Sequence, residues 1–159
     1  MKSIAVYPGT FDPITNGHTD LVKRAIKIFD KVLLAVAEKP PKKTLFSITE
    51  RVKFVETVFD GEEKVEVYSF HNLLVNFAKE HSANVILRGL RAVSDFEYEV
   101  QLANMNRLME PNIESVFMSP GEEFGFLSSS IVKDIAVHGG DLKKFVISDV
   151  EDALRKKLA

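Results

Sequence analysis

Residues 4–18 of the chain read IAVYPGTFDPITNGH, a short apolar run followed by a loop of small and polar residues. The run Ile4–Tyr7 predicts a β-strand. After the loop, apolar residues recur at helical spacing and predict a helix from Thr19 to Phe29: Leu21, Val22, Ala25, Ile26 and Phe29. A strand, a loop and a helix in this order form the first half of a βαβ unit.

The same alternation continues along the chain. Further short runs rich in β-branched residues predict four more strands: Val32–Val36, Val65–Tyr68, Val85–Leu87 and Ser115–Met118. We therefore expect an α/β fold, with a single doubly wound (Rossmann-like) parallel sheet of about five strands and helices on both faces. At 159 residues the chain fits one domain, residues 1–159, that buries a core without disulfides.

Capping residues and periodicity indicate the other helices. Ser47 with Glu50 has the spacing of a capping box and predicts a helix over residues 49–59. Ser148 with Glu151 repeats that spacing before a final helix. Periodicity alone predicts two more helices, Leu73–Ala78 and Phe96–Met109.

Composition and charge exclude several classes of protein. The net charge is −2, so the surface as a whole does not attract nucleic acid. The chain has no cysteine, which excludes disulfides, thiol catalysis and thiolate metal sites. No apolar run is long enough to cross a membrane, and the stretch before Pro8 is too short for a secretory signal. We expect a cytoplasmic protein with neither nucleic-acid nor membrane partners.

The loop after the first strand is the first candidate site, because ligands of parallel sheets bind beyond the carboxyl ends of the strands. It has neither a G-x-G-x-x-G pattern nor a Walker loop. Gly17 lets a ligand approach the backbone near a helix N-terminus, which favours phosphate, and His18 can donate a hydrogen bond to that phosphate. A histidine at a helix start is often a cap or a core residue instead. Thr10 and Asn16, however, add polar groups that a plain loop does not need.

Two other loops carry groups that suit phosphate. Arg88 and Arg91 flank Gly89 after the fourth predicted strand, and guanidinium groups fork onto phosphate oxygens. A solvated surface pair is the alternative interpretation. The serines at 128–130 follow the fifth strand, where they can cap a helix or, with its free N–H groups, hold a triphosphate. Lys42 follows the second strand, in a loop where lysines are usually solvated.

Three stretches together resemble one enzyme family. Residues 15–18, TNGH, are similar to the T/H-x-G-H motif of the nucleotidyltransferase superfamily. Residues 123–133, EFGFLSSSIVK, resemble its second signature, I-S-S-T-x-I-R, with Lys133 in place of the arginine and its role left open. The longer stretches 7–18 and 87–99, LRGLRAVSDFEYE, resemble the bacterial phosphopantetheine adenylyltransferases, and the resemblance extends over essentially the whole chain.

This resemblance implies a reaction and a set of residues. Members of the family transfer the adenylyl group of ATP, which carries Mg²⁺, to 4′-phosphopantetheine in coenzyme A biosynthesis, giving dephospho-coenzyme A and pyrophosphate. His18 would stabilise the transition state, with Thr10 and Lys42 as further catalytic residues. The implied acceptor contacts are Thr10, Lys42, Leu74, Arg88 and Asn106. The implied ATP contacts are Thr10, Phe11, Gly17, His18, Gly89, Leu90, Arg91, Glu99, Phe124, Gly125, Phe126, Leu127, Ser128, Ser129 and Ser130. The family also implies a homohexamer, and no metal ligands from the protein are expected.

The residues themselves favour direct transfer. The sequence offers no activated nucleophile, since it has no cysteine and no G-x-S-x-G pattern. An acceptor phosphate is already an anion, so the protein needs only to position the reactants and to neutralise charge. Two alternatives remain. One is an adenylyl- or cytidylyltransferase for another small acceptor, nicotinamide mononucleotide or glycerol phosphate, and the other is a nucleotide-binding sensor without catalysis.

Overall fold

The computed structural model describes residues 1–91 and 93–159, so Ala92, in the stretch 87–99, lies outside the described residues. The strands of the described part are β1 (Ile4–Gly9), β2 (Lys31–Ala37), β3 (Val65–Phe70), β4 (Val85–Gly89) and β5 (Glu114–Met118). They form one parallel sheet in the order β3-β2-β1-β4-β5. The predicted fold class is confirmed, and each predicted strand is present and longer than expected by one or two residues.

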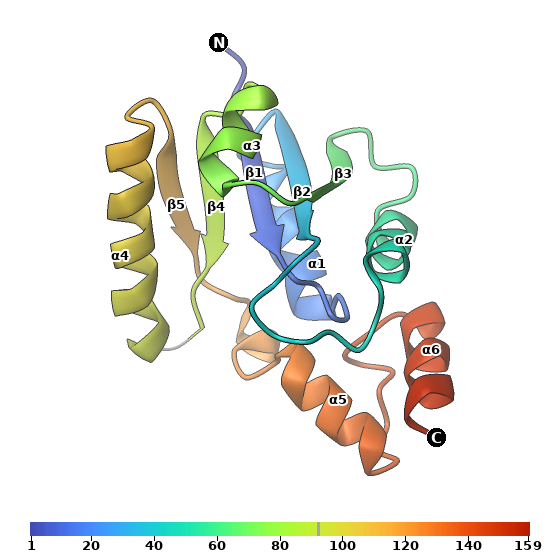
Figure 1. The fold of residues 1–159 in the computed structure, drawn as a ribbon. Coiled ribbons are helices and arrows are strands. Elements are labelled where there is room, and N and C mark those ends of the chain that lie inside the picture. The colour runs from blue at the N-terminus through green and yellow to red at the C-terminus, as the bar shows by residue number, and fades with distance from the viewer. Residues whose placement is uncertain (92) are drawn as a thin grey trace.

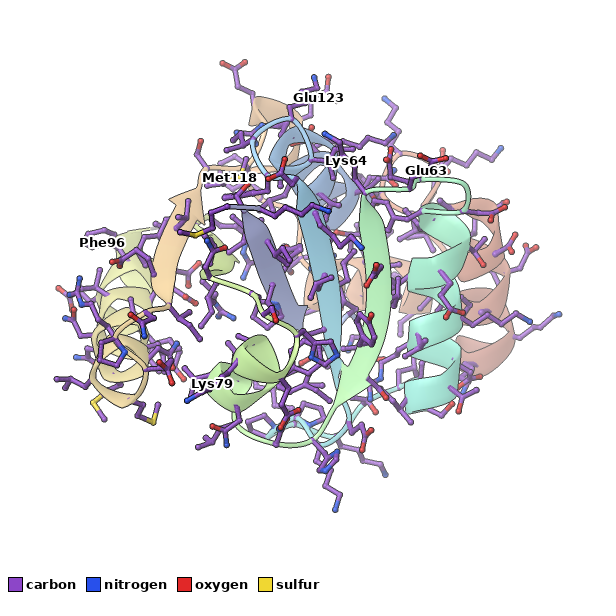
Figure 2. All side chains as sticks on the ribbon, turned by 90° about the horizontal axis from the view of Figure 1, so that it is seen from above. Glu63, Lys64, Lys79, Phe96, Met118 and Glu123 are labelled. Carbon is purple, nitrogen blue, oxygen red and sulfur yellow. The ribbon has the colours of Figure 1, made fainter. Side chains whose placement is uncertain are left out.

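Helices cover both faces of this sheet. The described helices are α1 (Asn16–Ala25), α2 (Ile48–Val58), α3 (Leu74–Glu80), α4 (Val93–Met109), α5 (Ser129–Val137) and α6 (Ser148–Leu158), with a 3₁₀ turn, η1 (Glu122–Phe124). In Figure 1, α3 lies in front of the sheet and α1 behind it, whereas α5 lies beyond the lower, carboxyl ends of the strands. Seen from above in Figure 2, α3 with Lys79 and the segment with Glu123 lie on opposite faces.

The alternation of side chains along each strand divides the core into two layers. Ala5 of β1 faces the layer that contains Leu21 of α1. Its neighbour Val6 faces the other layer, which contains Phe77 of α3. Burial on both faces explains why the strands are continuous apolar runs rather than alternating ones.

Of the two predicted capping boxes, the structure confirms one and contradicts the other. The capping box at α2 is confirmed, because Ser47 N donates to Glu50 Oε2 at 2.8 Å and Glu50 N donates to Ser47 Oγ at 3.2 Å. The predicted box at α6 is wrong, since Ile147 is the N-cap and makes no side-chain capping bond. The carboxylate of Glu151 instead accepts a hydrogen bond from Arg155 at 3.3 Å, one turn further along the helix.

Arg51 is a charged residue on the buried face of α2, with 1% of its surface exposed. Its Nη1 donates to Thr10 O and to Ala37 O, both at 2.8 Å, and its Nε donates to Phe46 O at 3.2 Å. One side chain therefore joins the loop after β1, the end of β2 and the residue that precedes the α2 cap. Buried charge is tolerated here because three hydrogen bonds to carbonyl oxygens offset the loss of water.

Replacing Arg51 should destabilise the fold strongly. Arg51→Met keeps much of the side-chain length but leaves three carbonyl oxygens without their donor, at about 1–3 kcal/mol for each one that stays buried. We expect the free energy of unfolding, measured by urea titration with circular dichroism, to fall by at least about 3 kcal/mol. Arg107→Met, at a side chain that is 54% exposed, is the matched control and should change it by no more than about 1 kcal/mol. Equal losses in the two variants would contradict the clamping role of Arg51.

Candidate functional site

A cavity of about 630 Å³ opens at the carboxyl edge of the sheet. It lies where the strand order reverses, with β2 on one side of β1 and β4 on the other. Its volume suits a small-molecule ligand. Most of the predicted site residues line it: Thr10, Gly17, His18, Leu74, Arg88, Gly89, Leu90, Arg91, Phe124, Leu127, Ser128, Ser129 and Ser130.

The remaining predicted residues do not line the cavity. Phe11 is 2% exposed, and its ring packs edge-on against His18 with centroids 5.0 Å apart. Glu99 is buried behind Arg88. Lys42 is exposed, and from its loop Lys39, Pro40 and Pro41 line the cavity instead. The lining also does not include Asn106, Gly125 and Phe126.

His18 is held in one tautomer by the start of α1. The backbone N–H of Thr15 donates to His18 Nδ1 at 2.9 Å, so Nδ1 is an acceptor. Burial lowers the pKa of His18 to about 4, and the positive charge of Arg91 lowers it as well. The imidazole is therefore neutral near pH 7 and carries its proton on Nε2. Because His18 lines the cavity, this N–H is available to a ligand there.

The tight turn beneath His18 depends on a glycine. A Cβ added at Gly9 would lie 2.9 Å from the ring of Phe11, too close for any other residue without a shift of that ring. Phe11 itself adopts a φ of 49°, a backbone conformation that is costly for a residue other than glycine. The ring of Phe11 fills the space below Tyr7 and His18, with 5.5 Å between the centroids of Phe11 and Tyr7. The loop thus holds the ring of His18 in place by packing the ring of Phe11 against it.

Arg88 is bound to a carboxylate rather than solvated. Its Nε and Nη2 donate to the two oxygens of Glu99, both at 2.6 Å. Burial alone would lower the pKa of Arg88, but the hydrogen bonds and negative charge of Glu99 raise it above its ordinary value. The bidentate pair orients the guanidinium at the cavity wall. Arg88 is therefore not the solvated surface residue of the alternative interpretation.

The N-terminus of α5 forms another wall of the cavity. Ser128 Oγ accepts from Ile131 N at 3.1 Å and caps the helix, which confirms the capping interpretation of the serine run for this residue. Ser129 Oγ donates to Pro13 O at 2.7 Å and joins α5 to the first loop. Arg91 Nη1 donates to Leu127 O at 3.3 Å. Two of the three serine hydroxyls are therefore engaged within the protein, while the helix N-terminus still faces the cavity.

Two charged residues that position the site were absent from the sequence prediction. Asp12 accepts from the backbone N–H groups of Leu45 and Phe46, at 2.8 and 2.9 Å, and from Lys133 Nζ at 3.1 Å. The role left open for Lys133 is thus, in this structure, an ion pair with Asp12. Arg51 could have been found, since it lies four residues before Val55 on the same helical face. Asp12 has no comparable signal in the sequence.

No group of three or more His, Asp or Glu side chains in residues 1–91 and 93–159 is arranged to hold a metal ion. No helix in those same ranges combines the length and the apolar character of a membrane span.

Known proteins resemble this chain in sequence pattern and in fold. A family model described as cytidylyltransferase-like matches residues 6–156. A protein from Vibrio parahaemolyticus assigned as a nicotinate-nucleotide adenylyltransferase is 18% identical, with a TM-score of 0.74 over 99% of this chain and 95% of that one. A bifunctional NMN adenylyltransferase/ADP-ribose pyrophosphatase from Francisella tularensis is 16% identical, with a TM-score of 0.69 over 98% of this chain.

This chain spans 49% of the Francisella protein, which also has a structure in complex with AMP and a manganese ion, at 17% identity and a TM-score of 0.69. At these identities the likeness to the solved structures shows the fold.

The state of His18 can be observed directly. With ¹⁵N-labelled histidine, NMR should show an unprotonated Nδ1 and a protonated Nε2 for His18. These two signals should not change between about pH 8 and pH 5.5, because the pKa of His18 is about 4. His18→Gln identifies the signals by their loss. A midpoint near pH 6.5, or a proton on Nδ1 at neutral pH, would contradict the assignment.

Proposed function

Because the chain belongs to the cytidylyltransferase-like family of nucleotidyltransferases, we propose that it transfers the adenylyl group of ATP to 4′-phosphopantetheine. The observation that carries this proposal is the convergence of three separate motif stretches, 7–18, 87–99 and 123–133, on one cavity. Each of these stretches resembles the phosphopantetheine adenylyltransferases, and each contributes a donor group or a helix N-terminus suited to phosphate.

The chemistry is a single displacement at phosphorus. An oxygen of the acceptor phosphate forms a bond to the α-phosphorus of ATP, and the bond from that phosphorus to the bridging oxygen breaks. Pyrophosphate leaves with the electron pair. No proton must be removed from the acceptor, because its phosphate is already an anion. The protein therefore acts by positioning the two phosphates in line and by stabilising the charge between them.

Each charged group has a place in this scheme. His18, neutral and with its proton on Nε2, donates to an oxygen of the α-phosphate. Arg91 and the N-terminus of α5 bind the leaving phosphates. Arg88 uses the edge that Glu99 does not occupy, Nη1, to bind the acceptor phosphate. Thr10 is a further acceptor contact on the cavity wall.

Lys42 remains a proposed acceptor contact, because residues 39–41 of its loop form one wall of the cavity. Leu74 and Phe70 add apolar surface on the wall, which suits the pantetheine arm. We also propose that Mg²⁺ enters with ATP as part of the substrate, as the manganese complex of the Francisella protein supports. A cytoplasmic homohexamer remains part of the same proposal.

A second acceptor class competes with this proposal. The solved neighbours include proteins assigned as nicotinate-nucleotide and NMN adenylyltransferases, and the same fold serves those acceptors. Two cationic groups of the cavity, Arg88 and Arg91, would suit the phosphate of a mononucleotide equally. The acceptor must therefore be decided by assay rather than by the fold.

The assay pairs the purified protein and Mg·ATP with one acceptor at a time. We expect the mass of dephospho-coenzyme A with 4′-phosphopantetheine, and no adduct with nicotinate mononucleotide, nicotinamide mononucleotide or glycerol 3-phosphate. Pantetheine, which lacks the phosphate, should give no product, and CTP should not replace ATP. A product from one of the other acceptors would show that this acceptor, and not 4′-phosphopantetheine, is the substrate. ATP binding without any product would favour the sensor.

His18→Ala should lower kcat by about 10²–10³-fold, because one preorganised donor to the transition state is lost. The Kd of ATP, measured by calorimetry, should change by less than about threefold, since the donor acts mainly on charge that develops during transfer. His138→Ala is the matched control, at a side chain that is 74% exposed at the C-cap of α5, and should leave both quantities unchanged. A loss of ATP affinity as large as the loss of kcat would remove His18 from this role.

A further inference from the structure

Tyr7 carries a hydroxyl group that the fold does not use. The residue is 7% exposed and lines the cavity. Its ring packs edge-on against Phe11 and lies 6.4 Å from the ring of His18, centroid to centroid. None of the hydrogen bonds among the described residues involves its hydroxyl, although buried tyrosine hydroxyls usually have a partner.

The hydroxyl opens onto the cavity rather than into the core. In the described part of the chain, no fully enclosed side-chain nitrogen or oxygen lacks a hydrogen-bond partner. An unpaired Tyr7 oxygen must therefore retain some accessible surface, and the residue lines the cavity at the end of β1. A phenylalanine would fill the same core space, so packing alone does not account for the oxygen.

The groups around Tyr7 indicate which kind of ligand atom its hydroxyl would bind. Its charged neighbours are Arg88 and Arg91, and both are cations that donate hydrogen bonds. Burial raises the pKa of Tyr7 well above its usual range, although the two arginines act in the opposite direction. The hydroxyl therefore stays protonated and is a donor. A buried donor beside two cations and the N–H of His18 lacks an acceptor, and an anion is the group that would satisfy all of them.

We propose that Tyr7 is a substrate-binding residue whose hydroxyl donates a hydrogen bond to a phosphate oxygen of the bound reactants. The phosphate is either that of the acceptor or the α-phosphate of ATP, since both reactants are expected to meet between His18 and Arg88. The proposal rests on the proposed function for the presence of those two phosphates. It assigns Tyr7 a direct contact in addition to those of His18, Arg88 and Arg91.

Tyr7→Phe tests this role, because it removes one oxygen and keeps the ring that packs on Phe11. Tyr68→Phe is the matched control. Tyr68 also lies in a strand of the sheet, but its hydroxyl donates to Glu66 at 2.6 Å and it is not among the residues of the cavity. Calorimetry would measure the Kd of Mg·ATP, pyrophosphate, 4′-phosphopantetheine and pantetheine for both variants and the unaltered protein. Steady-state kinetics and thermal unfolding would be measured alongside.

We expect Tyr7→Phe to weaken phosphate binding or turnover by about 10- to 100-fold, the usual effect of losing a hydrogen bond to a charged group, with unfolding unchanged. A loss for 4′-phosphopantetheine but not for pantetheine identifies the acceptor phosphate. A loss for ATP but not for pyrophosphate identifies the α-phosphate, and a loss in kcat alone places the contact in the transition state. The control variant should match the unaltered protein in every ligand measurement.

Three results would overturn the proposal. One is that all affinities and kcat of Tyr7→Phe stay within about twofold of the unaltered protein, less than one hydrogen bond is worth. Another is an equal loss of affinity for pantetheine and for 4′-phosphopantetheine. The third is a loss of affinity or of kcat that is accompanied by a lower melting temperature, because the substitution would then have disturbed the fold. If the unaltered protein binds ATP but does not use 4′-phosphopantetheine, the proposed function fails separately. In that case the Kd values of ATP and pyrophosphate for Tyr7→Phe test the role of Tyr7, and an unchanged affinity for ATP rejects that role.

Discussion

Two buried charges, Asp12 and Arg51, hold the loops of the cavity in a single arrangement. Removing a charge from water is costly, and the cost is offset only where hydrogen bonds replace those of the solvent. Asp12 receives two backbone N–H groups and Lys133, while Arg51 donates to three carbonyl oxygens. The loops after β1 and β2 and the helix α5 are bound together by these contacts. An arrangement that broke these contacts would leave the charges without their partners, which favours the observed positions of the loops.

This rigidity matters because the site works through electrostatics. The chain has a net charge of −2, yet its cavity presents Arg88, Arg91 and the N–H of His18. Such donors stabilise an anion best when they need no reorganisation as charge develops. His18 is locked by Thr15 and Arg88 by Glu99. The positive character is therefore local and preorganised, which suits phosphate chemistry without making the whole surface attractive to polyanions.

The fold leaves the choice of acceptor to the walls of this cavity. The switch between β1 and β4 creates an opening in any sheet of this order, and unrelated specificities can be built upon it. In this chain the β3–α3 connection contributes Phe70 and Leu74, and the loop after β2 contributes Lys39 and Pro40. These residues lie outside the elements that hold His18, so under the proposed function this wall could change with the acceptor while the groups around His18 are kept.

Local residue patterns predict the layers of the fold and the loops that meet at its carboxyl edge, because burial on both faces imposes apolar strands and helical periodicity on local segments. The sequence also predicted half of the residues that line the cavity, since the motifs lie at the ends of strands β1 and β4 and after β5. The folded structure was needed to show which tautomer His18 adopts, that Arg88 is paired with Glu99, and that Lys39 rather than Lys42 lines the cavity. It also showed the ion pair of Asp12 with Lys133, 121 residues apart. Such contacts depend on distances of a few ångströms between segments remote in the chain, and local residue patterns carry no information about those distances.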